Sequence, residues 1–250
     1  MIILKSRSDI DKMKVPCRVV AETLAGLRGM VRPGITTAEL DRFAEEFIRR
    51  SGAAPAFKGY MGYPCSLCAS VNEEVVHGIP SGRVLKEGDI VGLDVGALVG
   101  GFYGDAAVTV PVGRISDAAT KLLTVTEASL HKGIEQAVAG NRVSDISHAV
   151  QTYVEAFGFS VVRDFVGHGI GRKLHEEPQV PNFGPPGQGP VLKVGTTIAI
   201  EPMINAGVSH TVVMDDGWTA VTLDRKYSAH FEHTVAVTEN GPEILTQVGG

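Results

Sequence analysis

Two aspartates at the ends of a short turn could hold a cation. Asp94 and Asp105 flank Val99-Gly100-Gly101, a natural tip for a hairpin of antiparallel strands. A two-residue turn at 99–100 puts the aspartates directly opposite each other, and a turn at 100–101 puts them diagonally. In either register both side chains share one sheet face. Carboxylates about 5 Å apart repel each other unless a proton or cation lies between them. We expect a cation; the alternative is an aspartate that caps the turn or stays in solvent.

Two glutamates and one histidine bring similar groups from the second part of the chain. If the two parts face each other, Glu201 and Glu232 add to a cluster of four carboxylates that no local Lys or Arg neutralises. Two divalent cations would balance this charge. His168 in Gly167-His168-Gly169 supplies a single imidazole, and such an oxygen-rich set suits Mn, Fe(II), Co or Zn. Paired metals activate water and polarise a carbonyl together, so hydrolysis is the expected chemistry.

An internal repeat would bring these residues together. Val84-Leu85-Lys86-Glu87-Gly88 and Val191-Leu192-Lys193-Val194-Gly195 are 107 positions apart, and the same shift carries Asp94 onto Glu201. Coincidence among short motifs is the alternative, but the matches keep a consistent order along the chain. We therefore expect one domain over residues 1–250, built from similar halves of about 6–112 and 116–240.

The elements that must position these residues follow the same repeat. Apolar spacing predicts amphipathic helices over about 6–30, 36–52, 116–140 and 144–158. Thr36 and Glu39 form a capping-box pattern at the second of these. Residues 90–95 and the alternation at 67–71 predict strands. The expected class is α/β (α+β), with an antiparallel sheet flanked by two helix pairs.

Composition limits the partners of the chain. The 250 residues are 44% hydrophobic, 20% charged and carry a formal charge of −5, which offers no attraction to DNA or to anionic lipid. The apolar start Ile2-Ile3-Leu4 is too short for a signal peptide or a membrane span. Three cysteines give no basis for a disulfide framework. We expect a cytoplasmic monomer with reduced thiols.

Seven segments together resemble the type I methionine aminopeptidases. In chain order they are Val76-His77-Gly78-Ile79-Pro80, Leu93-Asp94-Val95, Gly104-Asp105, Gly167-His168-Gly169-Ile170-Gly171, His175-Glu176-Glu177-Pro178, Ile200-Glu201-Pro202-Met203 and Phe231-Glu232-His233-Thr234. Each segment alone is weak, but their order and spacing cover almost the whole chain. The resemblance implies the duplicated pita-bread fold, two divalent metal ions, and removal of the initiator methionine from nascent proteins when the second residue is small. The chain resembles the short bacterial form, without a Cys/His-rich N-terminal extension.

The resemblance also assigns roles to seven residues. It implies that Asp94, Asp105, His168, Glu201 and Glu232 are metal ligands, that Asp105 and Glu232 bridge the ions, and that Glu201 takes the proton of the attacking water. His77 and His175 would contact the substrate, with His175 donating to the scissile carbonyl and His77 lying near the amide nitrogen. An isolated histidine more often packs or caps a turn, but both stand inside matching motifs.

The resemblance places four residues around the methionine side chain. They are Tyr60, Tyr63, Cys68 and Trp218, and Phe57 is a further candidate. Ordinary core packing is the alternative for each. Leu174 departs from the family pattern, since enteric-type enzymes have Phe before this histidine, so this wall of the pocket is expected to differ in shape.

Other functions fit the sequence less well. Cys65-Ser66-Leu67-Cys68 has the C-x-x-C spacing of a redox pair or of half a zinc knuckle. A zinc knuckle would need a second pair, which is missing, and a redox pair belongs before a helix, whereas this motif lies on a predicted strand. Aminopeptidase P, prolidase and creatinase relatives use similar ligands but usually carry an additional N-terminal domain, for which the first helix, beginning within ten residues of Met1, leaves no room. Metal-free binding modules on this fold tend to lose ligands, and this chain keeps all five. The sequence leaves docking on ribosomes open.

Overall fold

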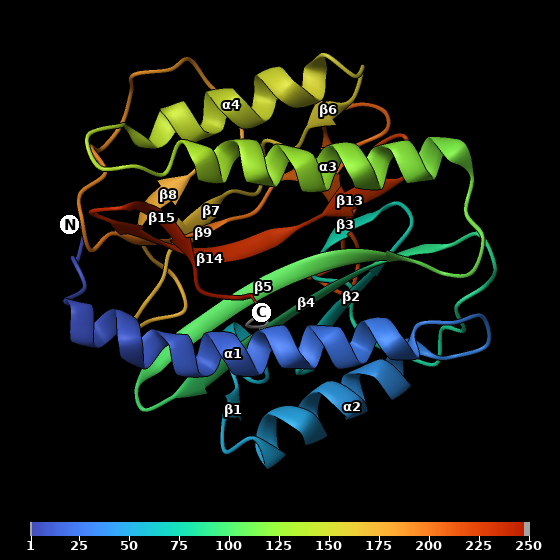
Figure 1. Cartoon of the computed structure of the whole chain (residues 1–250). Helices are drawn as coiled ribbons and strands as arrows, with labels where there is room; N and C mark the ends of the chain where they lie inside the picture. Colours follow the sequence, from blue (N-terminus) through green and yellow to red (C-terminus); the bar gives the residue numbers. More distant parts are fainter. Residues whose placement is uncertain (1, 248–250) are drawn as a thin grey trace.

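Two pairs of helices cover one face of a curved antiparallel sheet (Figure 1). The computed structural model describes residues 2–247. The helices are α1 (Arg7–Met30), α2 (Thr37–Arg50), α3 (Asp117–Glu135) and α4 (Val143–Glu155), with a short 3₁₀ turn η1 (Tyr60–Gly62). Residues of both α1 and α3 line one cavity over the sheet, so both helix pairs lie on the same side of it.

The strands form one large sheet and two small ones. Their bounds are β1 Ala54–Pro55, β2 Leu67–Val71, β3 Glu74–Val76, β4 Ile90–Val99, β5 Phe102–Pro111, β6 Ser160–Val161, β7 Gly167–Gly169, β8 Glu176–Val180, β9 Thr197–Ile200, β10 Met203–Asn205, β11 Thr211–Val213, β12 Ala220–Thr222, β13 Ser228–His230, β14 Glu232–Thr238 and β15 Gly241–Ile244. The large sheet has the order β1-β4-β5-β14-β9-β7-β8, with β2 paired to β4 and β15 to β14. The small sheets are β13-β10-β6 and β11-β12-β3. The predicted mixed class with an antiparallel sheet and flanking helix pairs is confirmed.

Local sequence explains where the helices begin. The Thr36 side chain accepts from the Glu39 amide while Glu39 reaches back to the Thr36 amide, and Ser6 with Asp9 forms the same capping box at α1. The third helix ends at Glu135, five residues before the expected Gly140.

The hairpin of β4 and β5 resolves the register that the sequence left open. Val99 pairs with Phe102, and Gly100 and Gly101 form the turn with φ values of +58° and +77°. Such left-handed backbone suits glycine. Asp94 therefore pairs with Ala107, and Asp105 lies diagonal to Asp94 on the same face.

The same backbone hydrogen bonds occur in both parts of the chain. The Leu85 amide donates to the Ile35 carbonyl at 2.8 Å, and the Leu192 amide donates to the Asn141 carbonyl at 2.8 Å. Each pair tethers the segment before a strand to the loop between two helices. These bonds accord with a duplication, while the single domain and its half boundaries stay a prediction.

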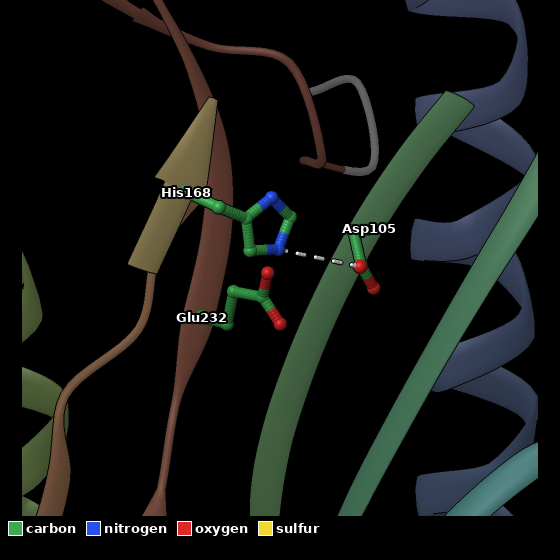
Figure 2. A group of neighbouring side chains, drawn as sticks. All are labelled: Asp105, His168 and Glu232. Atoms are coloured by element: carbon green, nitrogen blue, oxygen red, sulfur yellow. Dashed lines mark ion pairs between the residues drawn. The ribbon is translucent and has the colours of Figure 1, made fainter. Parts of the chain in front are cut away.

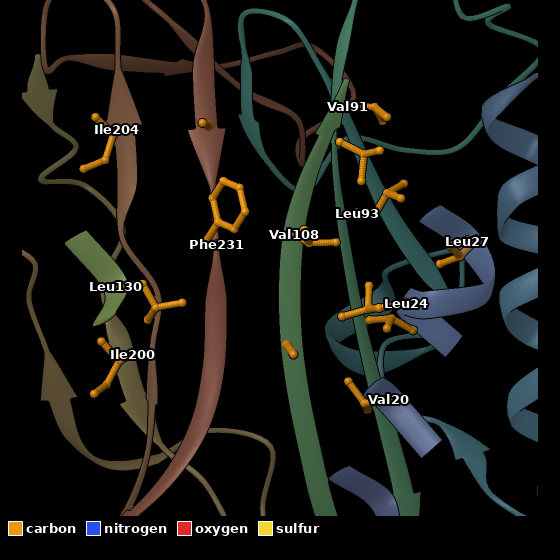
Figure 3. Packing of buried hydrophobic residues seen from close by; sticks show 14 of the residues in the cluster. Val20, Leu24, Leu27, Val91, Leu93, Val108, Leu130, Ile200, Ile204 and Phe231 are labelled. Carbon is orange, nitrogen blue, oxygen red and sulfur yellow. The ribbon is translucent and has the colours of Figure 1, made fainter. Parts of the chain in front are cut away.

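The core lies between the helices and the sheet (Figure 3). Leu24 and Leu27 of α1 pack toward Leu93 and Val108, and Leu130 of α3 packs near Ile200. The helices thus fix the position of β4, β5 and β9 from behind. Within residues 2–247, no helix is both long and apolar enough to cross a bilayer.

Candidate metal centre

Five neighbouring strands bring the five predicted ligands together. Asp94 lies on β4, Asp105 on β5, Glu232 on β14 and His168 on β7, and Glu201 directly follows β9. These strands are consecutive in the sheet order β4-β5-β14-β9-β7. The order of the strands in the sheet therefore brings together residues that are up to 138 positions apart in the chain.

The five residues Asp94, Asp105, His168, Glu201 and Glu232 are here called the acid cluster, and their ligand atoms face one another. One ligand atom each of Asp105, His168 and Glu232 lies within 4.8 Å of the others, and their side chains point to a common centre (Figure 2). His168 Nε2 lies 3.5 Å from Glu201 Oε1 and 4.0 Å from Asp105 Oδ2. His168 Nδ1 lies 2.9 Å from the Gly169 carbonyl, which can only accept. This carbonyl therefore holds the proton on Nδ1 and leaves Nε2 free as a ligand.

Glycines on both sides of His168 let β7 approach its neighbours. A Cβ at Gly169 would lie 2.2 Å from the Glu177 carbonyl oxygen, and one at Gly167 would lie 2.4 Å from the Ala199 carbonyl oxygen. No side chain fits at such distances, so the Gly-His-Gly spacing is a steric requirement for placing this imidazole.

The electrostatics of the acid cluster fit a cation. Asp94 Oδ1, Asp105 Oδ1 and Glu232 Oε1 are buried and have no hydrogen-bond partner among the described residues. Burial raises the pKa of Asp94 to about 7, and burial together with the neighbouring carboxylates raises the pKa of Asp105, Glu201 and Glu232. Burial lowers the pKa of His168 to about 3, so its imidazole is neutral. Neutral imidazole beside crowded carboxylates is the donor set that a divalent ion requires.

The acid cluster forms the floor of a cavity of about 250 Å³. Every residue that the sequence placed around the substrate lines it, namely Tyr60, Tyr63, Cys68, His77, His175 and Trp218, together with Phe57 and Leu174. The described lining contains no Lys or Arg. An apolar cavity ending in acids suits a ligand with an uncharged side chain and a cationic or metal-bound group.

His175 stands between the acid cluster and the cavity wall. Its ring contacts the His168 ring, with centroids 4.3 Å apart, and its Nδ1 lies 2.8 Å from the Tyr60 hydroxyl. Burial lowers the pKa of His175, so the ring is neutral. A phenol is a good donor and a neutral imidazole nitrogen a good acceptor, so Tyr60 favours the tautomer with the proton on Nε2.

His77 is held in a strained backbone conformation. Its φ is +61°, and its ring meets Phe165 and Trp218 edge-on with centroids 5.5 and 6.3 Å away. Burial lowers the pKa of His77 to about 4. A residue with a side chain seldom adopts such a φ, and strain of this kind clusters at functional sites.

Tyr63 and Cys68 form the pocket wall beside Asp94. The Tyr63 hydroxyl lies 3.1 Å from the Leu67 carbonyl and 3.0 Å from the Gly78 carbonyl, and its ring meets Trp218 edge-on at 5.1 Å. Cys68 is fully buried on β2, and burial and the nearby Asp94 raise the pKa of its thiol. Burial also raises the pKa of Cys65. Redox-active dithiols have lowered thiol pKa values, so this pair lacks their signature.

Sequence reasoning missed several residues of the site. His230 is buried, with Nε2 3.7 Å from Glu201 Oε2, and burial lowers its pKa to about 3. Val76, Phe165, Val166 and Met203 line the cavity as well. His230 directly precedes the family segment that begins at Phe231, and the pairing of β13 with β10 sets it beside Met203. The two valines, Phe165 and Met203 lie within those segments or at most two residues from one, so position along the chain was the available signal for all five residues.

Comparisons with known proteins agree with this geometry. Metallopeptidase family M24 matches residues 11–239. The "Methionine aminopeptidase" of Clostridium perfringens is 58% identical over 248 residues, covering 99% of this chain and 100% of the relative. The "Methionine aminopeptidase 1" of Bacillus subtilis is 56% identical over 248 residues, with the same coverage.

Solved structures share the fold. The crystal structure of methionine aminopeptidase from Thermotoga maritima superposes with a TM-score of 0.97 at 51% identity, covering 99% of this chain and 100% of that one. A prolidase from Pyrococcus horikoshii gives a TM-score of 0.81 at 22% identity, and this chain covers 65% of it. The prolidase likeness concerns the fold alone. The predicted pita-bread fold is confirmed by these neighbours.

Proposed function

This chain belongs to metallopeptidase family M24, and from this premise we propose that it removes the N-terminal methionine from nascent proteins and peptides whose second residue is small. The observation that carries the proposal is the acid cluster at the floor of an uncharged cavity. The relatives over the full chain length bear the name methionine aminopeptidase, which supports a metal-dependent exopeptidase.

Two divalent ions, of Mn, Fe(II), Co or Zn, are the proposed cofactors. Asp94, Asp105, His168, Glu201 and Glu232 would hold them, with Asp105 and Glu232 as the bridging carboxylates. When bound, such ions polarise the scissile carbonyl and lower the pKa of a water molecule. Metal analysis of protein purified without chelator tests this donor set, and Asp105→Asn should lower the metal content. An unchanged content in that variant would count against a bridging role.

The side chains of this chain supply the remaining chemistry. Glu201 is the proposed acceptor of the proton of the attacking water, because its carboxylate lies in the acid cluster beside His168. His175 donates from Nε2 to the scissile carbonyl, whose oxygen becomes more negative as the water attacks the carbonyl carbon. His77, which lines the same cavity, serves the departing amide nitrogen. Replacing either histidine by Ala should lower kcat or kcat/KM by about 10²- to 10³-fold without loss of metal.

The cavity explains the proposed specificity. Tyr60, Tyr63, Cys68 and Trp218 surround an unbranched side chain without offering a charge, and soft apolar walls suit a thioether. The second residue must fit beside His77 and His175. Gly, Ala, Ser, Thr, Cys, Pro and Val should be accepted, whereas Lys, Leu and Phe should displace the histidine contacts and lower kcat/KM.

A series of Met-X-Gly-Gly peptides followed by mass spectrometry tests the activity. We expect release of one methionine when X is small, and no cleavage of N-acetyl-Met-Ala-Ser. Preference for X-Pro peptides whatever their first residue would favour the aminopeptidase P alternative. A protein that binds no metal and cleaves no peptide would instead favour the metal-free binding module.

The cytoplasm is the proposed compartment and a monomer the proposed state. The three cysteines are free, and two of them are buried in reduced form, as a reducing compartment allows. Nascent chains are the proposed source of substrate, and docking on ribosomes would bring them near. Sedimentation of the purified protein, with and without ribosomes, tests whether it is a monomer and whether it docks on ribosomes.

A further inference from the structure

A second cavity lies on the helix-covered face of the sheet, directly behind the acid cluster. It has a volume of about 210 Å³ and lies between α1 and α3, over β5 and β14. Glu232 and His233 are neighbours on β14, so their side chains point to opposite faces. Glu232 joins the acid cluster, and His233 lines this back cavity together with His131 of α3.

Two imidazoles meet in the back cavity. The ring centroids of His131 and His233 are 6.3 Å apart with an interplanar angle of 54°. Two imidazoles bound to one ion have centroids separated by about 5 to 6 Å, given metal–nitrogen bonds of about 2 Å. His131 is exposed, so a small rotation of its side chain closes this difference. Among residues 2–247, neither His131 nitrogen makes a hydrogen bond, and the one side-chain hydrogen bond of His233 is made by Nδ1.

The second imidazole is held in place by the C-terminal segment. His233 Nδ1 lies 2.9 Å from the Thr246 hydroxyl, whose oxygen also accepts from the Thr234 amide at 3.1 Å. Thr246 is buried, so this contact fixes the ring. A histidine with Nδ1 bonded to a fixed protein oxygen and Nε2 facing a cavity has the arrangement of a metal ligand.

A carboxylate completes the donor set. Glu127 lines the back cavity one helical turn before His131, and positions i and i+4 of a helix share a face. Arg28 of α1 lines the opposite wall, and Glu127 offsets its charge. We propose that His131, His233 and Glu127 form a second metal site, separate from the acid cluster, that takes a nitrogen-preferring divalent ion such as Zn²⁺. Two imidazoles with one carboxylate suit Zn²⁺ better than Mg²⁺ or Ca²⁺.

Zinc titration of the full chain without a histidine tag tests this site. By isothermal titration calorimetry, the parent protein should bind one more equivalent of Zn²⁺ than His131→Ala. His148→Ala is the matched control, because His148 is also exposed but lies on α4, away from the cavity. The control should keep the parent stoichiometry, and methionine release should be unchanged in both variants.

Thr246 provides a finer test of the geometry. Thr246→Val removes the hydroxyl that orients His233 and should weaken the additional Zn²⁺ equivalent by about 10- to 100-fold. Thr246→Ser keeps the hydroxyl and should bind like the parent. Equal numbers of Zn²⁺ equivalents in the parent and in folded His131→Ala would overturn the proposal, as would equal affinities of the Val and Ser variants.

Discussion

Glu201 is placed between two imidazoles. Its two carboxylate oxygens lie 3.5 Å from His168 Nε2 and 3.7 Å from His230 Nε2. Glu201→Gln keeps the size of the side chain but removes both the anionic ligand and the proton acceptor. We expect kcat for Met-Ala-Ser to fall by a factor of about 10² to 10⁴, with an unchanged circular dichroism spectrum. Cleavage above a few per cent of the parent rate would remove Glu201 from its role as base.

The Tyr60 hydroxyl acts on His175 and not on the size of the pocket. Tyr60→Phe keeps the ring that lines the cavity but removes the donor to His175 Nδ1. Part of the His175 population should then carry its proton on the wrong nitrogen, so kcat should fall about tenfold while KM for Met-Ala-Ser stays within about twofold. Steady-state kinetics of the purified variant measure both constants.

Tyr103→Phe is the control for this substitution. Tyr103 is a half-buried tyrosine near Tyr60 that does not line the substrate cavity. Its kinetic constants should match those of the parent. A rise in KM alone for Tyr60→Phe would show that the hydroxyl contributes to substrate binding and not to the state of His175.

At the scale of elements, the close contact of α1 with β5 fixes Asp105. A Cβ at Gly104 would lie 2.7 Å from the Cys17 amide nitrogen, in the backbone of α1. Gly104→Ala must therefore push the helix from the strand, and we expect a loss of about 1–3 kcal/mol in the free energy of unfolding. The displaced strand should also lower metal affinity. Urea denaturation of the metal-free protein measures the first effect.

Gly29→Ala is the matched comparison. Gly29 lies in α1, its φ is ordinary, and a Cβ there would meet nothing within 4 Å. Alanine should therefore raise the free energy of unfolding, by at most about 1 kcal/mol. Equal effects of the two substitutions would mean that α1 and β5 adjust to each other without cost.

Much of this element arrangement was predictable from local sequence signals. Capping residues such as Thr36 and Glu39 mark helix starts, and apolar spacing marks the buried helix faces. The hairpin register was left open between turns at 99–100 and 100–101. The structure has the second turn, whose two glycines both adopt the positive φ that valine disfavours. His230 stands one residue before a family segment, but its contact with Glu201 could not be predicted, because that contact depends on the pairing of β13 with β10, which no local pattern encodes.

For the whole molecule, the metal-free protein should become less stable as pH rises through about 7. The pKa values of Asp94, Asp105, Glu201 and Glu232 are raised in the folded state, so folding favours their protonated forms. This stabilisation is present at low pH and is lost as pH rises through the folded pKa values, about 7 for Asp94. The buried histidines have lowered pKa values and act in the opposite sense only below about 6.5.

Two measurements test this loss of stability with rising pH. Between about pH 6.5 and 7.5, the Tm of the metal-free protein should fall, and the difference from the Mn²⁺-loaded protein should widen. Metal binding at pH 7 should release protons, seen as a dependence of the calorimetric enthalpy on the buffer. Proton uptake on metal binding would contradict these pKa directions.

The junction of β5 and β14 has a consequence for motion. The two sides of the large sheet meet there through the pairs Glu232 with Ala107 and His233 with Ala106, extended by the Thr234 hydroxyl, which donates to the Asp105 carbonyl at 2.8 Å. By contrast, β4 and β5 share ten pairs. Repulsion among the carboxylates of the acid cluster pushes β5 and β14 apart, and only two residue pairs join these strands. The sheet should therefore open first at this junction. Amide hydrogen exchange at Asp105 and His233 should therefore be fast without metal and slow with it, while the amides of Leu93 and Val95 stay protected in both states.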